Sequence, residues 1–423
     1  MFNLFRYGFF SFPAAVSLLM MQVYIPSYIA QIGVFSLTTI GIVFFAARLI
    51  DMLSDLFIGY ASDITPPNFG RRRIWIALGT PFFLLIFYQL LLVPESVGGL
   101  FTVTALWYII GTCMIVPYYT WGAEMEIGYT AHTKYTGARV LFGLVGSVCA
   151  LILPAILMPE AELKKVLEFN FLLTGIFFLI GLILLSKLPD IGNVSSALLN
   201  WRDLFKIFEP KSNFNKLIAS QLFNGIANAL PATLFIFFVS YILKRADLAG
   251  PLLVTYFVFA ALSVPFWVKC ASLWPKERCW QVAMILASIT FTGALLVDEQ
   301  SLKLFFAITI ITGLMAGADL SIPASMLADI IDHDGERDGY RRPGIYFAVW
   351  GTTSKLTFAF AIMIAFTLLG MDFLAADDNQ ALVNTKWLTI LYALLPPIFK
   401  LISVVLLLGY NLKADKRLDQ TAD

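Results

Sequence analysis

Charge is scarce in this sequence. Only 13% of its 423 residues are charged, whereas 59% are hydrophobic, and the formal net charge is +1. Soluble domains carry about twice that share of charge, so the chain is predicted to lie in a membrane. The near-zero net charge also excludes the strong positive field with which proteins bind nucleic acid, so no nucleic-acid partner is expected.

Cysteine and histidine are also few. The four cysteines are isolated, which excludes a CxxC metal pattern and a disulfide framework. The two histidines, His132 and His333, fall in predicted loops, so no histidine-rich metal site is expected. No cleavable leader is evident, because the first apolar stretch is longer than a signal-peptide core and lacks an A-x-A-like cleavage site. We expect that stretch to be the first membrane helix.

Long apolar runs are what the sequence has in abundance. A helix needs roughly 20 apolar residues to cross a bilayer, and twelve runs come near or above that length. Their approximate limits are 8–32, 37–63, 74–93, 99–121, 135–158, 168–188, 215–243, 250–274, 279–297, 302–331, 343–370 and 387–410. The sequence therefore predicts an all-α polytopic membrane protein with twelve transmembrane helices, surrounded by lipid.

Lysine and arginine are distributed unevenly between the two ends of these runs. With both termini in the cytoplasm, twenty of the 29 fall on the cytoplasmic side, six on the opposite side and three within the runs. Cytoplasmic loops of membrane proteins are enriched in these residues. The asymmetry predicts cytoplasmic termini, and we expect the protein in the plasma (inner) membrane.

The longest polar connection divides the chain into two halves of six helices. The predicted organisation is an N-terminal half, a cytoplasmic linker, and a C-terminal half with a short cytoplasmic tail, over residues 1–188, 189–213 and 214–423. Each half contains a proline, an Ala-acid pair and a Gly-x-Arg in that order: Pro117, Ala123-Glu124 and Gly137-Ala-Arg139, then Pro323, Ala328-Asp329 and Gly339-Tyr-Arg341. The spacings differ, so chance is the alternative to an internal repeat. Two repeated halves with a midplane site are typical of transporters.

Three ionisable residues lie deep in the second apolar run. Arg48, Asp51 and Asp55 are spaced three and four residues apart, so they share one helix face. An ionisable group at that depth costs at least ~2.5–3.5 kcal/mol, so this face must meet other helices or water. Two carboxylates one turn apart cannot both ionise comfortably there; either one holds a proton or a hard cation lies between them. We predict a coupling-ion site, with a buried ion-pair network as the alternative.

Two further charges lie within predicted spans. Lys355 is too deep in the eleventh run to reach the interface easily, and its natural partner is Asp51 or Asp55. It is either a coupling residue or only a charge neutraliser. Asp319, in the tenth run, either binds substrate or pairs with a nearby amide or hydroxyl.

Charged clusters follow the second and tenth runs on the cytoplasmic side. The candidate gate residues are Asp63, Arg71, Arg72 and Arg73 in the first half and Asp329, Asp332 and Arg341 in the second. Acids and bases in such clusters can pair across helices when the cytoplasmic face closes, so we predict a cytoplasmic gate. The alternatives are a positive-inside anchor for the first cluster and a solvated loop for the second.

Aromatic side chains are plentiful near the same ends. Tyr118 and Tyr119 end the fourth run, and Trp350 lies in the eleventh. A ring face can stack on a sugar or contact an acyl chain, so these residues are candidates for the substrate cavity. The alternative is packing or an interfacial belt.

Together these residues resemble the glycoside–pentoside–hexuronide:cation symporter family (melibiose-permease-like) of the major facilitator superfamily. The resemblance spans most of the chain and rests on Tyr7-Gly8-Phe9, Arg48-Leu-Ile-Asp51-x3-Asp55-x3-Gly59, Gly70-Arg71, Ala328-Asp329-Ile-Ile-Asp332 and Lys355. It implies the major-facilitator fold, with two pseudo-symmetric halves and alternating access. It also implies a cation site at Asp51, Asp55 and Thr112, with Ser54 replacing an amide of the melibiose-permease branch. Lys355 and Arg48 are then coupling residues, and Arg139 matches a basic residue of the substrate cavity.

The sugar-binding pattern of that branch does not carry over. Two of its sugar-binding aspartates are replaced here by Ala15 and Ile115. A buried sugar hydroxyl without its acceptor loses much of its recognition energy, which argues against a galactoside. The family also resembles eukaryotic sodium-coupled lysophospholipid carriers with a more apolar cavity. A different glycoside, a hexuronide and an amphipathic lipid therefore stay open.

The predicted function is secondary active transport. We expect symport of a small organic solute, a glycoside or related sugar, with Na⁺ or H⁺ by a monomer that needs no other cofactor. A lysophospholipid or another amphipathic solute is the alternative cargo. A membrane prenyltransferase would use Asp51-x3-Asp55 and Asp329-x2-Asp332-x-Asp334 to hold Mg²⁺-diphosphate, but twelve spans exceed what it needs and Asp51 lies too deep. A sensor or lipid scramblase without ion coupling is the third alternative; no enzyme activity is expected.

Overall fold

The computed structural model describes residues 2–66, 70–125, 129–157, 162–189, 212–338, 343–373, 385–410 and 412. Every regular element within them is a helix. The chain divides into two compact units, Met1–Phe205 with Ile331–Thr352 and Lys206–Ile330 with Thr353–Asp423. The predicted linker 189–213 lies outside the described residues apart from 189, 212 and 213.

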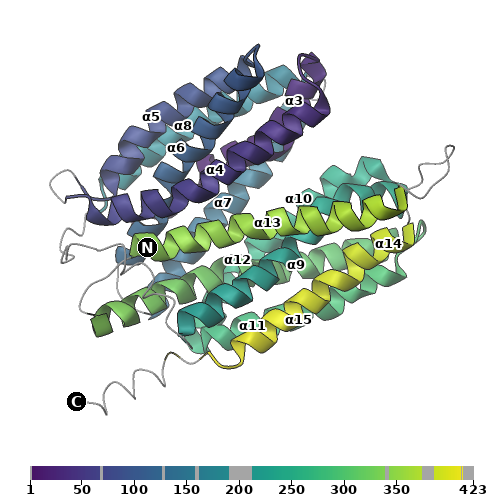
Figure 1. The fold of residues 1–423 in the computed structure, drawn as a ribbon. Helices are drawn as coiled ribbons and strands as arrows, with labels where there is room; N and C mark the ends of the chain where they lie inside the picture. The colour runs from purple at the N-terminus through teal and green to yellow at the C-terminus, as the bar shows by residue number, and fades with distance from the viewer. Residues whose placement is uncertain are drawn as a thin grey trace. The chain divides into compact units, whose positions relative to one another are not determined.

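The first unit is a bundle of long helices. They are α1 (Phe2–Gly8), α2 (Ser11–Leu19), η1 (Met20–Tyr24), α3 (Ile25–Ile32), α4 (Leu37–Ile64), α5 (Arg73–Leu91), α6 (Val97–Glu124), α7 (Tyr129–Leu157) and α8 (Leu163–Ser186). Helix α6 packs along both α4 and α5 (Figure 1). Helix α2 packs along α7. Fully buried aromatic residues such as Phe10, Phe87 and Phe178 fill the core of this unit. This packing places the polar residues of α4 against α6.

The second unit has the same helical character. It contains α9 (Asn213–Tyr241), η4 (Ala246–Leu248), α10 (Ala249–Leu273), α11 (Lys276–Thr292), η5 (Gly293–Leu296), α12 (Leu302–Asp338), α13 (Pro343–Phe373), α14 (Thr385–Thr389), η6 (Ile390–Leu394) and α15 (Leu395–Leu407). Helix α15 packs along α9 and α11. Phe238 and Tyr392 stack in its core with ring centroids 4.0 Å apart. The last turns of α12 and the first turns of α13 belong to the first unit.

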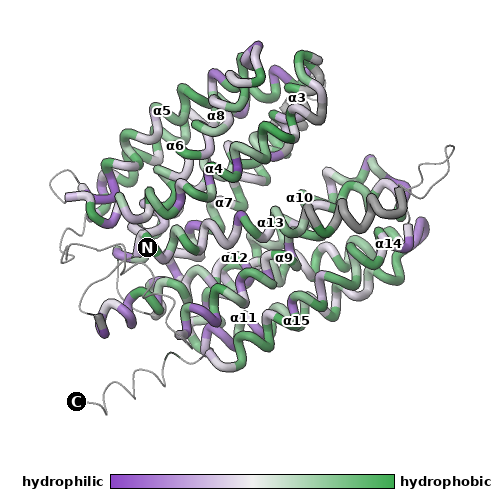
Figure 2. The backbone as a smooth tube through the Cα atoms, in the orientation of Figure 1, coloured by the Kyte–Doolittle hydropathy of each residue, from purple (hydrophilic) through white to green (hydrophobic). Residues whose placement is uncertain are grey.

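The length and composition of the helices suit a bilayer. Within the described residues, ten segments are long and apolar enough to cross a membrane. The long helices α4 and α13 are not among these ten, but their 28 and 31 residues correspond to about 42 and 46 Å of helix, more than a bilayer core of ~30 Å. Hydrophobic residues run along most of each helix in Figure 2. Large exposed side chains such as Leu53, Phe57 and Leu262 can then contact lipid tails at no hydrophobic cost.

Two of the predicted spans are interrupted by π-helical turns. The first, η1, ends two residues before Pro26, and the second, η6, ends two residues before Pro396. A proline ring clashes with the carbonyl four residues earlier and provides no N–H. Widening the preceding turn to a π-helix relieves that clash while the chain continues as a helix.

The structure corrects the predicted surroundings of both histidines. His132 lies in α7 and His333 in α12, and both side chains are buried rather than in loops. Helix α12 continues to Asp338, seven residues beyond the predicted end of the span at 331. The tenth span was predicted to end at residue 331 because charged residues become frequent after it. The helix continues because its acidic residues find partners, as Asp329 does at Lys276 and Asp332 at His132.

Candidate functional site

Asp51, a buried acid of the second predicted span, lies between α4 and α6. Its side chain is 1% exposed. The Thr112 hydroxyl donates to its Oδ1 across 2.7 Å, and Arg48 Nη1 donates to its Oδ2 across 3.1 Å. Both carboxylate oxygens therefore accept a hydrogen bond, as a buried carboxylate requires. The structure brings together three of the residues that the sequence singled out: Arg48, Asp51 and Thr112.

Asp55 lies one turn further along α4 and is equally buried. Its Oδ2 is 3.4 Å from the hydroxyl of Thr352 in α13. Ser54 donates its hydroxyl to the backbone carbonyl of Asp51 across 2.8 Å. The Ser54 oxygen therefore keeps only its acceptor capacity for a cation. Carboxylate and hydroxyl oxygens close together are ligands that suit a hard cation such as Na⁺.

Arg48 contacts an aromatic ring as well as Asp51. Its Cζ lies 4.3 Å from the ring centroid of Tyr108, which is buried in α6. The Arg48 side chain is 32% exposed, whereas the Asp51 carboxylate to which it donates is buried. Tyr108 was not singled out by the sequence, and no pattern in the chain marks it.

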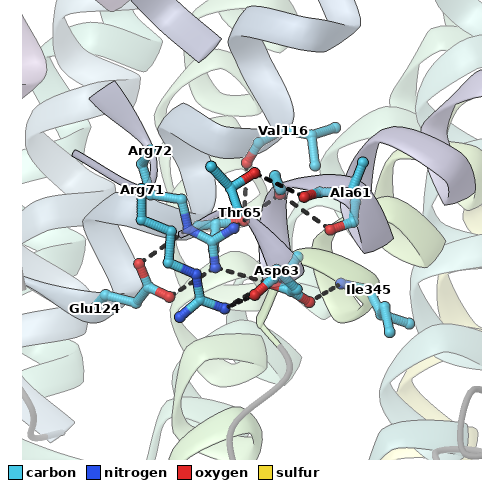
Figure 3. Close-up of polar contacts among 12 residues, drawn as sticks. Ala61, Asp63, Thr65, Arg71, Arg72, Val116, Glu124 and Ile345 are labelled. Carbon is cyan, nitrogen blue, oxygen red and sulfur yellow. Dashed lines mark hydrogen bonds and ion pairs between the residues drawn. The ribbon is translucent and has the colours of Figure 1, made fainter. Parts of the chain in front are cut away.

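A second polar cluster lies at the ends of α4, α5 and α6 (Figure 3). The Arg72 guanidinium donates to both oxygens of Glu124, through Nε at 3.1 Å and Nη2 at 2.7 Å. It also donates to Asp63 Oδ1 at 2.7 Å and to Ser62 Oγ at 2.8 Å. Burial lowers the pKa of Arg72, but the Glu124 and Asp63 carboxylates outweigh burial and raise it, so the guanidinium stays charged.

Asp63 connects this cluster to the beginning of α13. Its two oxygens accept the backbone N–H groups of Gly344 and Ile345 at 2.9 and 3.2 Å. A carboxylate at a helix N-terminus satisfies unpaired donors and faces the positive end of the helix dipole. The approach requires glycine, because a Cβ on Gly344 would lie 2.6 Å from Asp63 Oδ1 and would also overlap the carbonyl of Gly59.

The other two arginines of the predicted gate have different partners. Arg71 donates to the backbone carbonyl of Asp63, and its Nη2 is 3.7 Å from Asp63 Oδ1. Arg73 donates to the carbonyl of Leu188 at 2.8 Å and lies over the ring of Trp121. The structure therefore groups Arg71 and Arg72 with Asp63, whereas Arg73 holds the end of α8.

The acidic residues of the predicted second gate lie in both units. Asp329 pairs with Lys276, at the first residue of α11, with Nζ 2.6 Å from Oδ2. Asp332 lies in the first unit, where its Oδ2 is 3.2 Å from Nε2 of His132. Arg341 lies outside the described residues.

Two predicted cavity residues form a cation–π pair. Arg139 Cζ lies 3.8 Å from the ring centroid of Tyr119. Tyr118, by contrast, is fully buried, donates its hydroxyl to the carbonyl of Tyr7 at 2.7 Å, and stacks on the Tyr7 ring. This environment favours a packing role for Tyr118. Trp350 is half-buried in α13.

Asp319 belongs to a polar cluster within the second unit. Trp280 Nε1 donates to its Oδ1 at 2.7 Å, and Asn228 Nδ2 to its Oδ2 at 3.3 Å. Lys400 also donates to Oδ2 of Asp319, and to Asn224 Oδ1 at 2.8 Å. Of the two possibilities left open by the sequence, the described contacts are those of pairing. Lys355 lies in the second unit, so its pairing with Asp51 or Asp55 stays a prediction.

Among the residues of these clusters that sequence reasoning missed, four are ionisable: Glu124, His132, Lys276 and Lys400. Glu124 and Lys276 had a signal, because the Ala-acid pair recurs in both halves and each acid needs a base. Lys400 also had one, since it is one of three basic residues within the spans. His132 was placed in a loop, although a histidine ahead of a long apolar run can begin a helix.

A family model for the MFS/sugar transport protein family matches residues 6–414. Among curated proteins, the human sodium-dependent lysophosphatidylcholine symporter 1 is 21% identical over 92% of this chain and 78% of its own length. The Escherichia coli inner membrane symporter YicJ is 22% identical over 88% of this chain and 83% of its own. The uncharacterized symporter YnaJ of Bacillus subtilis is 24% identical over 89% and 84%.

Solved structures resemble this chain over nearly its whole length. A bacterial homologue of the iron transporter ferroportin matches with a TM-score of 0.73 and 14% identity, covering 96% of this chain and 99% of its own. The E. coli fucose:proton symporter matches with a TM-score of 0.71 and 11% identity, covering 97% and 98%. At these identities the likeness shows the fold alone, and it confirms the predicted major-facilitator fold. With a family model covering nearly the whole chain, the protein belongs to the MFS/sugar transport protein family, and it is a multi-pass membrane transporter rather than an enzyme.

Proposed function

We propose that this transporter is a sodium-coupled symporter that works by alternating access. One observation carries the proposal: Asp51 is buried within the second predicted span, accepts the Thr112 hydroxyl at 2.7 Å, and lies one turn from the equally buried Asp55. Two adjacent buried carboxylates cannot both stay charged unless a proton or a cation compensates one of them. Several curated relatives are named as sodium-dependent symporters, which supports Na⁺ over H⁺ as that charge.

The cation would be held by oxygen ligands from two helices. Asp51, Asp55 and Ser54 supply them from α4, and Thr112 from α6. Lys355 would respond to cation occupancy, because an ammonium competes with Na⁺ for the same carboxylates. Binding of the sodium ion would then change whether Lys355 pairs with these carboxylates.

The cluster around Asp63 would close the cytoplasmic side. Arg72 ties α5 to α4 and α6, and Asp63 holds the first turn of α13. Opening requires these charge-assisted bonds to break together, so the cluster acts as a lock. Asp329, Asp332 and Arg341 would contribute the corresponding charges from the second half.

The orientation follows from the distribution of basic residues. We place both termini in the cytoplasm, the protein in the plasma or inner membrane, and the functional unit as a monomer of two related halves. The E. coli relative named an inner membrane symporter is consistent with this location. The cytoplasmic lock then faces the side on which twenty of the 29 basic residues lie.

Two classes of solute fit the proposal. A glycoside or related sugar follows from the resemblance to the melibiose-permease-like symporters, and Arg139 over Tyr119 would provide a donor beside an aromatic face. An amphipathic solute such as a lysophospholipid is favoured by Ala15 and Ile115, which remove two sugar-binding carboxylates. The names of the vertebrate relatives support this second class.

The test uses purified protein in two steps. A thermal-shift panel of methyl glycosides, glucuronides and lysophosphatidylcholine, with and without Na⁺, selects the solute, because a ligand stabilises the state that it binds. Uptake into proteoliposomes under an inward Na⁺ gradient is then compared for wild type, Asp51→Asn and the exposed-site control Glu168→Gln. We expect Asp51→Asn to lose accumulation while the control retains it. Accumulation by Asp51→Asn that still follows the Na⁺ gradient would refute the assignment of the cation site.

A further inference from the structure

The contact between Arg48 and Tyr108 suggests how the cation site is tuned. In the structure, Arg48 Nη1 occupies Oδ2 of Asp51 and Thr112 occupies Oδ1. An incoming cation can share Asp51 with a neutral hydroxyl, whose oxygen can itself become a ligand. It cannot share an oxygen comfortably with a guanidinium, because two positive charges would then compete for one carboxylate.

Arg48 and Asp51 differ in how far they are buried. The Arg48 side chain is 32% exposed, whereas Asp51 is 1% exposed. Part of the Arg48 side chain therefore lies at the surface of the protein, whereas the carboxylate that it binds is enclosed. A long side chain that is one third exposed loses conformational freedom when it is held in one ion pair, so a further contact helps to keep the guanidinium beside Asp51.

Tyr108 provides that support from the neighbouring helix. Its ring centroid is 4.3 Å from the guanidinium carbon of Arg48, well within the ~6 Å range of a cation–π contact. Tyr108 is buried, and its ring is fixed edge-on against Trp107 with centroids 5.2 Å apart. A buried ring packed in this way can hold the guanidinium beside Asp51.

We propose that Arg48 is a tethered cation that competes with the coupling ion for Asp51, and that Tyr108 is the positioning residue that sets the strength of this competition. The inference rests on the proposed sodium site and adds what regulates its affinity. Without the ion, Arg48 pairs with Asp51 Oδ2, and the arriving ion must displace the guanidinium from that oxygen. Weakening the hold of Tyr108 on Arg48 therefore makes Na⁺ bind more tightly.

The experiment measures equilibrium binding of ²²Na⁺ to purified protein in nanodiscs, at fixed pH and with N-methylglucamine as the balancing cation. It needs no knowledge of the solute. Tyr108→Leu removes the ring, Tyr108→Phe keeps it, and Tyr88→Leu removes an exposed tyrosine ring from α5 as a control. We expect Tyr108→Leu to tighten Na⁺ binding about two- to fivefold, the worth of one partly exposed cation–π contact. Tyr108→Phe and Tyr88→Leu should stay within the error of wild type.

A second variant strengthens the test. Arg48→Gln removes the competing charge, and we expect at least about tenfold tighter binding, as for loss of a charge-assisted hydrogen bond. Tighter binding is a gain that a damaged fold would not produce. Unchanged or weaker binding in Tyr108→Leu, with wild-type binding saturable and lost in Asp51→Asn, would overturn the inference while leaving the sodium site intact. No saturable binding by wild type would overturn both.

Discussion

Neutralising Glu124 tests how much the cluster around Arg72 contributes to stability. Glu124→Gln keeps the side-chain volume and one acceptor oxygen but removes a negative charge. The structure gives Arg72 two bonds to Glu124, one to Asp63 and one to Ser62, with Arg72 and Glu124 side chains 1% and 3% exposed. The substitution therefore leaves a buried guanidinium with one counter-charge in place of two.

The magnitude follows from that geometry. Removing one partner of a buried ion pair typically costs about 3–5 kcal/mol. Because Asp63 and the remaining glutamine oxygen still accept hydrogen bonds from Arg72, we expect a loss of stability at the lower end of this range, about 3 kcal/mol. For a unit of roughly 200 residues, about 3 kcal/mol corresponds to a fall in Tm of about 6–12 °C.

The assay is thermal unfolding in detergent, followed by the fluorescence of the nine tryptophans. The control is Glu168→Gln, the same chemical change on the exposed face of α8, which should alter the free energy of unfolding by less than about 0.5 kcal/mol. If Glu124→Gln unfolds at the same temperature as that control, the reasoning that Arg72 depends on two counter-charges is refuted.

Two further predictions concern other close contacts. Gly344→Ala should cost about 1–3 kcal/mol by overpacking, because its Cβ would lie 2.6 Å from Asp63 Oδ1; Gly98→Ala, with open space around it, should be neutral or stabilising in the same melting assay. In the second unit, Asp319→Asn and Lys400→Met should each destabilise strongly, by about 3–5 kcal/mol. The double variant should cost clearly less than the sum of the two, because neither charge is then left alone; additive melting-temperature losses would contradict this pairing.

The positions of the membrane helices were largely predictable from sequence, whereas the end of α12 and the π-helical turns were not. Apolar runs of about 20 residues identify membrane helices because backbone groups in lipid must be paired internally. The extension of α12 to Asp338 was missed, because a charged run resembles a loop until its partners are known. Those partners, Lys276 and His132, are distant in sequence, and only tertiary packing brings them together.

The residues of the candidate site were also predictable only in part. Arg48, Asp51 and Asp55 could be grouped from the helical period alone, and Thr112 was added by the family resemblance. The pairing of Arg72 with Glu124 depends on how α5 packs against α6, which the sequence does not encode as a pattern. Tyr108 is one aromatic residue among many, and it becomes significant only through its distance to Arg48.

The two halves of the chain repeat one of these pairs at nearly constant spacing. Arg72 and Glu124 are 52 residues apart, and Lys276 and Asp329 are 53 apart. In each half the base stands at the beginning of the third predicted span and the acid near the end of the fourth. A chance recurrence of motifs does not require the paired atoms to meet, so these contacts support an internal repeat.

The two pairs differ in the base they use, and the difference has a physical reason. A guanidinium presents a planar fork that can serve two carboxylates, whereas an ammonium is a compact point charge. Arg72 serves both Glu124 and Asp63, and Asp63 in turn holds the first turn of α13. Helix α10 is the second span of the second half and so corresponds to α4. Its last turn, Cys270–Leu273, contains no acid, so Lys276 has no counterpart of Asp63 to bind there. The two pairs are therefore not equivalent: the cluster around Arg72 also contacts a helix from late in the chain through Asp63, so removing the charge of Arg72 should disturb α13 more than removing that of Lys276.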